Sequence, residues 1–530
     1  MRIEDALEQL QRVQNDPQAL TVATARIACE QIEPGLFPVL EAAAIPHWFD
    51  AATLAALLEI DLGLADHYYA RLIAVPQVES FKARNAYNVH EATRLAVRTC
   101  LAQEDRPRFD ELSHRAAECL AGPEAHQRIE ALYHRLSVDE PVEAAAALEK
   151  LFQEWHRTGR FGPLQTLALA LDELLAGQWL QGVARARALV CVGWIRGGRL
   201  PLKQTESMAR EAIALFVAAN EPQGEADARQ LLGDTLQTEG DLAGALREYQ
   251  VFKDIMRRLT RLDPDNTDWQ KDLSVSHNDV GGVLQAQGKL AEALREFQAG
   301  KDIKLRLTLL DPDNTDSQRD LSVSHNDVGR VLRAQGQLTE ALPEFQAFKD
   351  IMRRLTRLDP DNTGWQRELS VSHNNVGGVL RAQGQLPDAL REFQASKDIM
   401  RRLTQLDPDN TDWQRVLSVS HNNVGSVLQA QGKLAEALQE FQAVTDIMRR
   451  LTLLDPDNTD WQRDLSISHR WIARLFEQQG QLAEALTERE ADLAIVERLA
   501  RLDETNADWQ QDLTDSREAL EALKGRIGAD

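Results

Sequence analysis

A block of eight residues that returns every 48 positions constrains this sequence more than any other feature. The block reads DPDNTDWQ from Asp263, and copies begin at Asp311, Asp359, Asp407 and Asp455, with a decayed copy at Asp503. Its tryptophan recurs as Trp269, Trp365, Trp413, Trp461 and Trp509, and Ser317 stands in the one remaining place. Strict spacing over this length indicates tandem duplication of a structural unit that packs against its own copies. More than half of the 530 residues therefore form one stack rather than separate globular domains.

Each repeat predicts two antiparallel helices. Apolar residues recur at steps of three and four from Trp269 to Leu284, which is the period of one helix face. A glycine then predicts a turn, and a second apolar stripe, clearest from Leu338 to Leu358, ends at an Asp-Pro pair. Pro343 falls inside this second helix, so we expect a kink or a local weakness there.

The start of each first helix carries the pattern of a capping box. Thr267 is followed three residues later by Gln270, so the pattern predicts that the threonine caps the helix and the glutamine reaches back. The same pairs recur at Thr315 and Gln318, Thr363 and Gln366, Thr411 and Gln414, and Thr459 and Gln462.

The repeat resembles the tetratricopeptide repeat, whose usual unit has 34 residues. The resemblance lies in the small residue Gly281 of the first helix and in Ala293 and Phe297 of the second. It covers residues 225–503 as six units, the first divergent and the sixth with Ala473 for the glycine and Arg489 for the aromatic residue. It implies an all-α fold, a right-handed α-solenoid of helix-turn-helix repeats whose first helices line a concave groove. A helix within residues 504–530 is expected to cap the stack.

The residues before the array show no echo of the 48-residue period. Helices are expected within residues 1–40, at about 3–14 and 18–31, and again at 51–60. Residues 41–125 resemble the winged-helix module of bacterial STAND ATPases, because a short apolar strand, Val89-His90, leads into a helix that contains Arg94. The resemblance implies a small β-wing near residues 78–90. Residues 126–224 are expected to form helical hairpins that join this module to the array. The sequence contains no GxxxxGK[ST] phosphate loop, so nucleotide hydrolysis is not implied.

One column of the array offers the chemistry for holding a peptide. The asparagines Asn278, Asn326, Asn374 and Asn422 share one position of the first helix. Amide side chains both donate and accept hydrogen bonds, as an extended backbone requires, and Asn374-Asn375-Val376-Gly377 resembles the repeats of kinesin light chains, which use a similar ladder for peptides. The alternative is that duplication copied these asparagines as inter-helix hydrogen bonds, and both readings stay open. Nearby arginines would attract acidic groups: Arg330, Arg333, Arg381 and Arg474.

No pattern of catalytic residues emerges. The sequence contains no HExxH, GxSxG, GxGxxG or CxxC motif, so we expect no catalytic residue, no metal site, no cofactor and no enzymatic activity. A dyad of Cys100 or Cys119 with His90 or His114 would require contact in space, and none of the four lies in a recognisable protease motif.

A histidine also recurs once per repeat, at His277, His325, His373, His421 and His469. One imidazole per helix pair is poorly placed for chelation, because neighbouring first helices lie roughly 10 Å apart. A role in packing or in a hydrogen bond is therefore expected.

The composition limits the classes of partner. The chain has 83 acidic and 60 basic residues, a formal charge of −23, whereas phosphate neutralisation needs clustered Lys and Arg. The longest apolar run, 188–195, is far below the roughly 20 residues of a spanning helix. The N-terminus shows no secretory pattern, and the four cysteines are widely spaced. We expect a cytoplasmic protein with a protein or peptide partner, no membrane contact, no small-molecule substrate and little affinity for nucleic acid.

Three functions fit these patterns. The first is a non-enzymatic scaffold or adaptor that binds a protein segment in the groove, in a bacterial signalling or defence system. The second is a winged-helix DNA-binding transcriptional regulator. Its recognition region, residues 64–81, contains Arg71 but no other arginine or lysine, and Asp66 and Glu79 oppose that charge, so we expect weak affinity for DNA. The third is a regulatory subunit, inhibitor or cleavage target of a STAND ATPase or caspase-like protease, which depends on family association alone.

Overall fold

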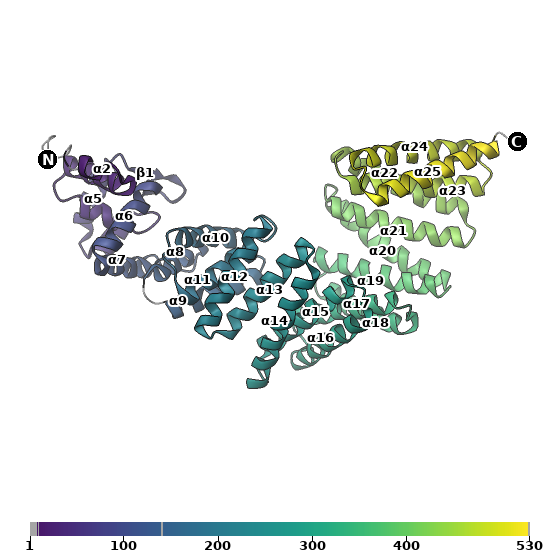
Figure 1. Cartoon of the computed structure of the whole chain (residues 1–530), viewed down its shortest axis with the longest axis horizontal. Helices are drawn as coiled ribbons and strands as arrows, with labels where there is room; N and C mark the ends of the chain where they lie inside the picture. The colour runs from purple at the N-terminus through teal and green to yellow at the C-terminus, as the bar shows by residue number, and fades with distance from the viewer. Residues whose placement is uncertain (1–7, 9, 139–140, 528–530) are drawn as a thin grey trace. The chain divides into compact units, whose positions relative to one another are not determined.

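The computed structural model describes residue 8 and residues 10–138 and 141–527. It comprises two compact units, Met1–Leu262 and Asp263–Asp530, and each is described by itself (Figure 1). Both units are built from α-helices, and one two-stranded sheet occurs in the described part of the chain. The prediction of a helical solenoid fold is confirmed. Among the described residues, no helix has the length and apolar character needed to cross a membrane.

The first part of the N-terminal unit is a helical module with a β-hairpin. Strands β1 (Val78–Phe81) and β2 (Ala86–Val89) pair antiparallel, where the sequence predicts a β-wing, and a short 3-10 turn, η1 (Lys82–Arg84), joins them. The helices around the hairpin are α2 (Pro17–Ile32), α3 (Phe37–Ala43), α4 (Ala51–Leu58), α5 (Leu62–Leu72) and α6 (Glu91–Glu104). The helices predicted at 18–31 and 51–60 are therefore confirmed. Of the one predicted at 3–14, residues 8 and 10–13 are helical, and residues 3–7 and 9 lie outside the described residues.

The rest of the N-terminal unit consists of helices that pack on their sequence neighbours. Their bounds are α7 (Arg106–Cys119), α8 (Ala125–Ser137), α9 (Pro141–Arg157), α10 (Phe161–Ala176), α11 (Gly182–Ile195), α12 (Leu202–Ala219), α13 (Pro222–Glu239) and α14 (Leu242–Leu262). A core around the fully buried Trp155 joins α8, α9, α10 and α11. Within residues 126–224, where the sequence predicts helical hairpins, α11 and α12 pack together.

The C-terminal unit repeats one helix pair and then adds a last helix. Each first helix begins one residue after an asparagine, and each second helix begins two residues after a glycine. The bounds are α15 (Thr267–Ala286), α16 (Leu290–Leu310), α17 (Thr315–Ala334), α18 (Leu338–Leu358), α19 (Thr363–Ala382), α20 (Leu386–Leu406), α21 (Thr411–Ala430), α22 (Leu434–Leu454), α23 (Thr459–Gln478), α24 (Leu482–Leu502) and α25 (Ala507–Ile527).

Close packing of a glycine against an aromatic ring holds the two helices of a pair together. A Cβ atom on Gly377 of α19 would lie 2.8 Å from Cε1 of Phe393 on α20, so only glycine admits the ring. In the last pair the position holds Ala473, and Arg489 replaces the ring and bonds to Glu477 at 2.9 Å. The alanine is therefore accommodated because its partner has also changed.

The helix caps differ from the sequence prediction by one residue. Asn266, not Thr267, is the N-cap of α15, and its Oδ1 accepts a hydrogen bond from Trp269 N at 3.0 Å. Gln270 does not reach back to the cap, because its Nε2 donates to the carbonyl oxygen of Pro264. The predicted threonine cap is wrong because the helix begins one residue earlier: Gln270 N, the amide that a threonine cap would have bonded, already donates to the carbonyl oxygen of Asn266. The same asparagine cap recurs at Asn314, Asn362, Asn410 and Asn458.

A ladder of lysine, glutamate and histidine links successive repeats. In one rung, Glu392 of α20 accepts a hydrogen bond from Lys349 Nζ of α18 at 2.7 Å and lies 2.6 Å from Nδ1 of His373 on α19. The prediction of a hydrogen-bonding role for the repeat histidines is confirmed. The equivalent rungs are Lys301–Glu344–His325 and Lys397–Glu440–His421, and the last, His469–Glu488, has Thr445 at the lysine position.

The ladder lowers the pKa values of its glutamates. Burial alone would raise the pKa of Glu392, but His373 and Lys349 outweigh burial and lower it to about 2. The pKa values of Glu344 and Glu440 are lowered for the same reasons. These glutamates are therefore ionised throughout the physiological pH range.

Pro343 lies inside α18, as predicted, but it does not end the helix. The bounds of α18 relative to the repeat equal those of α20, where Arg391 occupies the same position. The local weakness inferred for this helix stays a prediction.

Candidate functional site

The asparagine column of the first helices lies between successive repeats. Asn326 Oδ1 accepts a hydrogen bond from Asn375 Nδ2 of the next repeat at 2.7 Å, and Asn374 Oδ1 accepts one from Asn423 Nδ2 at 3.4 Å. The Oδ1 atoms of Asn278 and Asn422 are buried without a hydrogen-bond partner among the described residues. All four side chains are half-buried. For Asn326 and Asn374 these contacts correspond to the inter-helix role that the sequence left open, and they occupy the Oδ1 atom of each amide. The peptide-binding role of the column stays a prediction.

The four arginines proposed from the sequence are all exposed. Arg330 lies 3.7 Å from Asp327 on its own helix, whereas Arg333 and Arg381 lie over the rings of Phe345 and Phe393, 5.6 and 5.9 Å from the ring centroids. Arg333 also extends toward Gly378 of the next repeat, where a side chain would approach it.

Other first-helix arginines are ion-paired between repeats. Arg319 bonds to Glu368 at 2.6 Å and Arg463 to Asp512 at 2.7 Å. In contrast, Arg333, Arg381 and Arg474 form no ion pair within the described part of the chain. These three cations are therefore free to meet an acidic partner.

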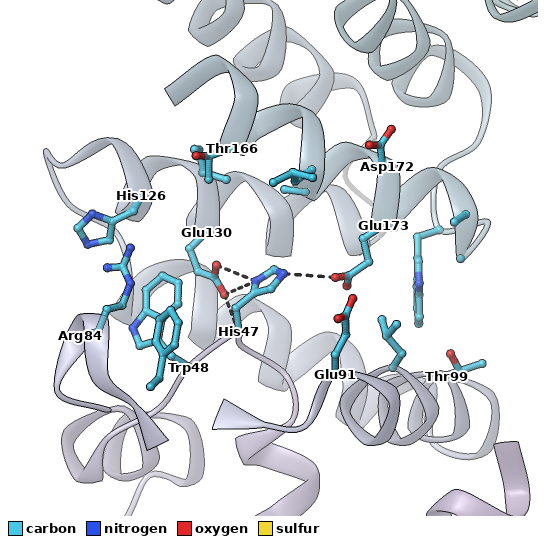
Figure 2. A pocket seen from close by; sticks show the side chains of 18 of the residues that line it. His47, Trp48, Arg84, Glu91, Thr99, His126, Glu130, Thr166, Asp172 and Glu173 are labelled. Carbon is cyan, nitrogen blue, oxygen red and sulfur yellow. Dashed lines mark hydrogen bonds and ion pairs between the residues drawn. The ribbon is translucent and has the colours of Figure 1, made fainter. Parts of the chain in front are cut away.

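A second candidate site is a pocket in the N-terminal unit, which the sequence did not indicate. It has a volume of about 790 Å³ and lies between the module of α2–α6 and the helices α8 and α10 (Figure 2). His47, Trp48 and Arg84 line it from the module, and Glu130 and Glu173 line it from the helices. Such a pocket between two substructures is a common place for a ligand.

His47 is clamped between two carboxylates at the floor of this pocket. Its Nδ1 lies 2.8 Å from Glu130 Oε2, its Nε2 lies 3.4 Å from Glu173 Oε2, and its backbone N–H donates to Glu130 at 2.9 Å (Figure 2). Burial opposes a charged imidazole, but Glu130 and then Glu173 outweigh burial and raise the pKa of His47. Burial also opposes a charged Glu130, yet His47 and His134 hold its pKa well below the usual range.

Further polar contacts complete this cluster. The guanidinium of Arg94 and the hydroxyl of Tyr133 both donate to Glu173, and Arg98 donates to the carbonyl oxygen of Ile45 at 2.6 Å. Burial lowers the pKa of His134 to about 4, so this imidazole is neutral at neutral pH. The cluster thus fixes the 44–50 segment and α6 against α8 and α10, and it leaves its own carboxylates neutralised.

Cys100 and Cys119 lie in surroundings that disfavour a thiolate. Burial raises the pKa of Cys100 and of Cys119 to about 11, which is the opposite of what a reactive thiolate requires. The Cys119 thiol donates to the carbonyl oxygen of Ala116 on its own helix. Within the described residues, no group of three or more His, Cys, Asp or Glu side chains is arranged to hold a metal ion.

The pocket was missed because no local pattern marks it. His47 and Trp48 lie in an irregular segment, and Glu130 and Glu173 belong to ordinary amphipathic helices that are separated from them by about the length of a domain. The only available signal was the pair His47-Trp48 beside a proline, which suggests a fixed turn but names no partner.

Comparison with known proteins identifies the fold. The structure is similar to the Signal Transduction ATPase with Numerous Domains (STAND) protein with a tetratricopeptide repeat sensor, PH0952, from Pyrococcus horikoshii, with a TM-score of 0.52 and 13% identity. The match covers 89% of this chain and 65% of that one, so this chain spans slightly less than two thirds of its length. No family profile and no curated protein sequence matches the chain.

Two further solved structures have lower scores. The apo form of RapI matches at a TM-score of 0.41 and 12% identity, over 60% of this chain and 99% of that one. A putative kinesin light chain from Podosopora anserina with nearly identical TPR-like repeats matches at 0.34 and 19% identity, over 44% and 98%. The repeat geometry and the similarity to PH0952 together show that the fold is a tetratricopeptide-like α-solenoid.

Proposed function

We propose that the chain is a non-enzymatic scaffold that binds an acidic, extended segment of a partner protein along the face of its first helices. The observation that carries the proposal is the set of exposed arginines, Arg333, Arg381 and Arg474, which have no ion pair among the described residues. An exposed guanidinium offers a planar, two-pronged donor to a carboxylate, and repeat arrays present such donors at regular intervals. The asparagines contribute by holding the first helices in register.

This proposal places the partner's acidic groups one repeat apart. Arg333 and Arg381 occupy the same position in successive first helices, and both rest on an aromatic ring that orients the guanidinium. Because a rim charge alone contributes little affinity, the partner must contact several repeats at once.

The experiment compares two triple variants of the full chain, each of which loses three positive charges. The first carries Arg333→Gln, Arg381→Gln and Arg474→Gln. The matched control carries Arg353→Gln, Arg401→Gln and Arg449→Gln on the second helices, where each arginine pairs only with an aspartate of its own helix. Partners captured from the source organism are cross-linked and mapped by mass spectrometry.

We expect the first variant to lose the cross-links of an acidic segment to the first helices and the control to retain them. Equal retention by both variants, with far-UV circular dichroism unchanged, would contradict the proposal. Raising the salt concentration should weaken the wild-type interaction, because exposed ion pairs are screened.

The setting of this scaffold is also a proposal. The likeness to a STAND protein with a tetratricopeptide repeat sensor supports a place beside such an ATPase in a bacterial signalling or defence system, as a regulatory subunit, inhibitor or cleavage target. The genes adjacent to this one test that idea directly. A DNA-binding role is less favoured, because Arg71 lies 3.3 Å from Glu33 and is therefore already paired.

A further inference from the structure

The pocket of the N-terminal unit has the size and lining of a small-ligand site. Its volume of about 790 Å³ falls within the range of about 300–1,000 Å³ that such sites occupy. Apolar side chains provide most of the wall, among them Trp48, Phe81, Leu169 and Trp179. Leu169 is 64% exposed although it is a large apolar residue. An apolar wall of this kind favours a ligand with an aromatic or branched apolar body.

The acidic groups around the pocket are nearly all neutralised by the protein itself. Glu130 is held by His47 and His134, and Glu173 by Arg94, Tyr133 and His47. Asp172 forms an ion pair with Arg196. These carboxylates therefore have no need of a cation from a ligand.

Glu91 is the remaining carboxylate, and its negative charge is stabilised by its position in the helix. It is exposed, and it lies in the first turn of α6, where the helix dipole stabilises a negative charge. Figure 2 shows it on the side of Glu173, away from Arg84 and His126.

Arg84 is different, because none of the described carboxylates pairs with it directly, and the charge of Glu130 only partly offsets the burial that lowers the pKa of Arg84. Its guanidinium lies 4.0 Å from the centroid of the Trp48 ring, and it forms no hydrogen bond or ion pair with any described residue. Trp48 in turn packs on Phe81, with 6.5 Å between centroids, and on His126, with 5.9 Å. The guanidinium is thus half-buried and oriented by an aromatic stack at one end of the pocket (Figure 2).

His126 adds a second donor at the same end. Burial and then the charge of Arg84 lower its pKa, so the ring is neutral at neutral pH and carries one N–H. It stands beside Arg84 in Figure 2. A planar guanidinium and a neutral imidazole together suit a carboxylate, which accepts several hydrogen bonds in one plane.

We propose that this pocket binds a carboxylate joined to an aromatic or branched apolar body, with the carboxylate at Arg84 and His126 and the body against Trp48, Phe81 and Leu169. This site is separate from the face of the first helices proposed to bind a partner protein. A small-molecule ligand here would differ from the expectation drawn from the sequence. A more highly charged anion such as a phosphate ester fits less well, because a single unpaired cation faces it and Glu130 and Glu173 lie in the same pocket. The carboxylate belongs either to a small molecule or to the C-terminus of a peptide.

The test uses isothermal titration calorimetry with the full chain and defined probes. Phenylacetate, 3-phenylpropionate and indole-3-acetate represent the small carboxylates, and tryptamine is the amine matched to indole-3-acetate. A tetrapeptide that ends in phenylalanine, with a free or an amidated C-terminus, distinguishes a peptide source. We expect saturable one-site binding of at least one carboxylate probe and none of tryptamine or of the amidated peptide.

Three variants locate the site. Arg84→Gln should weaken binding about tenfold or more, which corresponds to about 1.4 kcal/mol. Lys82→Gln is the matched control, because Lys82 is an exposed cation of the same short turn, and it should leave binding unchanged. Leu169→Trp should abolish binding by filling the pocket from an exposed position, without disturbing the core.

The proposal is overturned if no carboxylate probe binds at millimolar concentration, if tryptamine binds as tightly as indole-3-acetate, or if Arg84→Gln binds like the wild type. Far-UV circular dichroism establishes that each variant is folded. Should Arg84→Gln fail to fold, Leu169→Trp decides the question, because binding that survives it places the ligand elsewhere.

Discussion

Two junctions between repeats, built on the same plan, differ in how they are packed. Where α20 meets α21, Met400 and Leu403 are fully buried and join an apolar cluster with Trp413. Where α16 meets α17, the positions of Met400 and Trp413 hold Lys304 and Ser317. An apolar contact has thus been replaced by a charge and a small hydroxyl within an otherwise repeated framework.

The junction of α16 with α17 is the less stable of the two on physical grounds. Lys304 is only 7% exposed, and burial lowers its pKa, although Asp320, Asp327 and Asp279 partly offset that effect. Its ammonium forms no ion pair with the described residues. Leu307 is half-buried, whereas its counterpart Leu403 is fully buried. Identical helix bounds therefore do not imply equal stability, because each junction depends on a few side chains.

The largest expected effect comes from moving the weaker pairing into the stronger junction. The double variant Met400→Lys and Trp413→Ser should lower the free energy of unfolding by about 4–6 kcal/mol, because it removes buried apolar volume and buries a charge. Hydrogen exchange of the α20 and α21 amides, together with urea unfolding, measures the loss. A cost below about 1 kcal/mol would show that the two junctions are equivalent.

The reverse exchange should stabilise the protein by less. Lys304→Met with Ser317→Trp should raise the free energy of unfolding by about 1–3 kcal/mol, since it replaces a buried charge by apolar contacts that the fold already accommodates elsewhere. Slower hydrogen exchange of the α16 and α17 amides would show this gain in stability. Each single variant serves as the control, because an isolated tryptophan or methionine lacks its partner and should contribute less than half of the gain.

Both junctions contain a rung of the ladder, so the ladder should contribute similarly to the stability of each. Glu392→Gln should cost about 1–3 kcal/mol at pH 7, because the folded-state pKa of about 2 lies below the ordinary value of 4.5. A carboxylate with a depressed pKa stabilises the fold fully above about pH 4.5, and the contribution is lost as the pH falls toward 2. Urea unfolding of wild type and variant at pH 7, 4 and 3 measures the difference, which should shrink as the pH falls.

Two outcomes would change this view of the ladder. A cost of Glu392→Gln that is independent of pH would mean that ionisation of Glu392 does not stabilise the stack. A much greater cost for Glu344→Gln than for Glu440→Gln would mean that the weaker junction relies on its rung, since Glu344 belongs to the repeat that follows Lys301 on α16.

The smallest effect is expected at Pro343. Pro343→Ala should raise the free energy of unfolding by about 1 kcal/mol or somewhat more, and with it the melting temperature. The substitution restores a helical N–H and removes the clash of the ring with the preceding turn. The matched variant Arg391→Pro should lower stability by about 3 kcal/mol at the same position of α20. A fall in the melting temperature of Pro343→Ala would contradict the predicted weakness.

The sequence predicted the array well because a tandem repeat multiplies a weak local signal. The period, the two helices and the glycine turn recur in every unit, so chance patterns are excluded. The cap was misassigned by one residue, since Asn266 and Thr267 are both good caps and only the backbone geometry separates them.

The N-terminal pocket was not predictable in this way. His47 contacts Glu130 and Glu173 across 83 and more residues, and no periodicity connects them. The pairing of Asn326 with Asn375 was equally hidden, because the sequence shows which residues share a position but not which side chains meet across a junction. Such contacts follow from tertiary packing alone.

The ladder also bears on how an array of this kind can grow. Each lysine and its glutamate lie 43 residues apart, in two neighbouring units, and the spacing is the same along the ladder. Insertion or loss of one whole 48-residue unit therefore leaves every rung matched, whereas a partial one leaves a buried charge unmatched. Recombination between the nearly identical copies can thus change the number of units without leaving a rung unmatched. The exception is the end, where Thr445 stands at the lysine position and its hydroxyl bonds Ser468 at 2.9 Å, so the last unit is not joined by the lysine–glutamate pair.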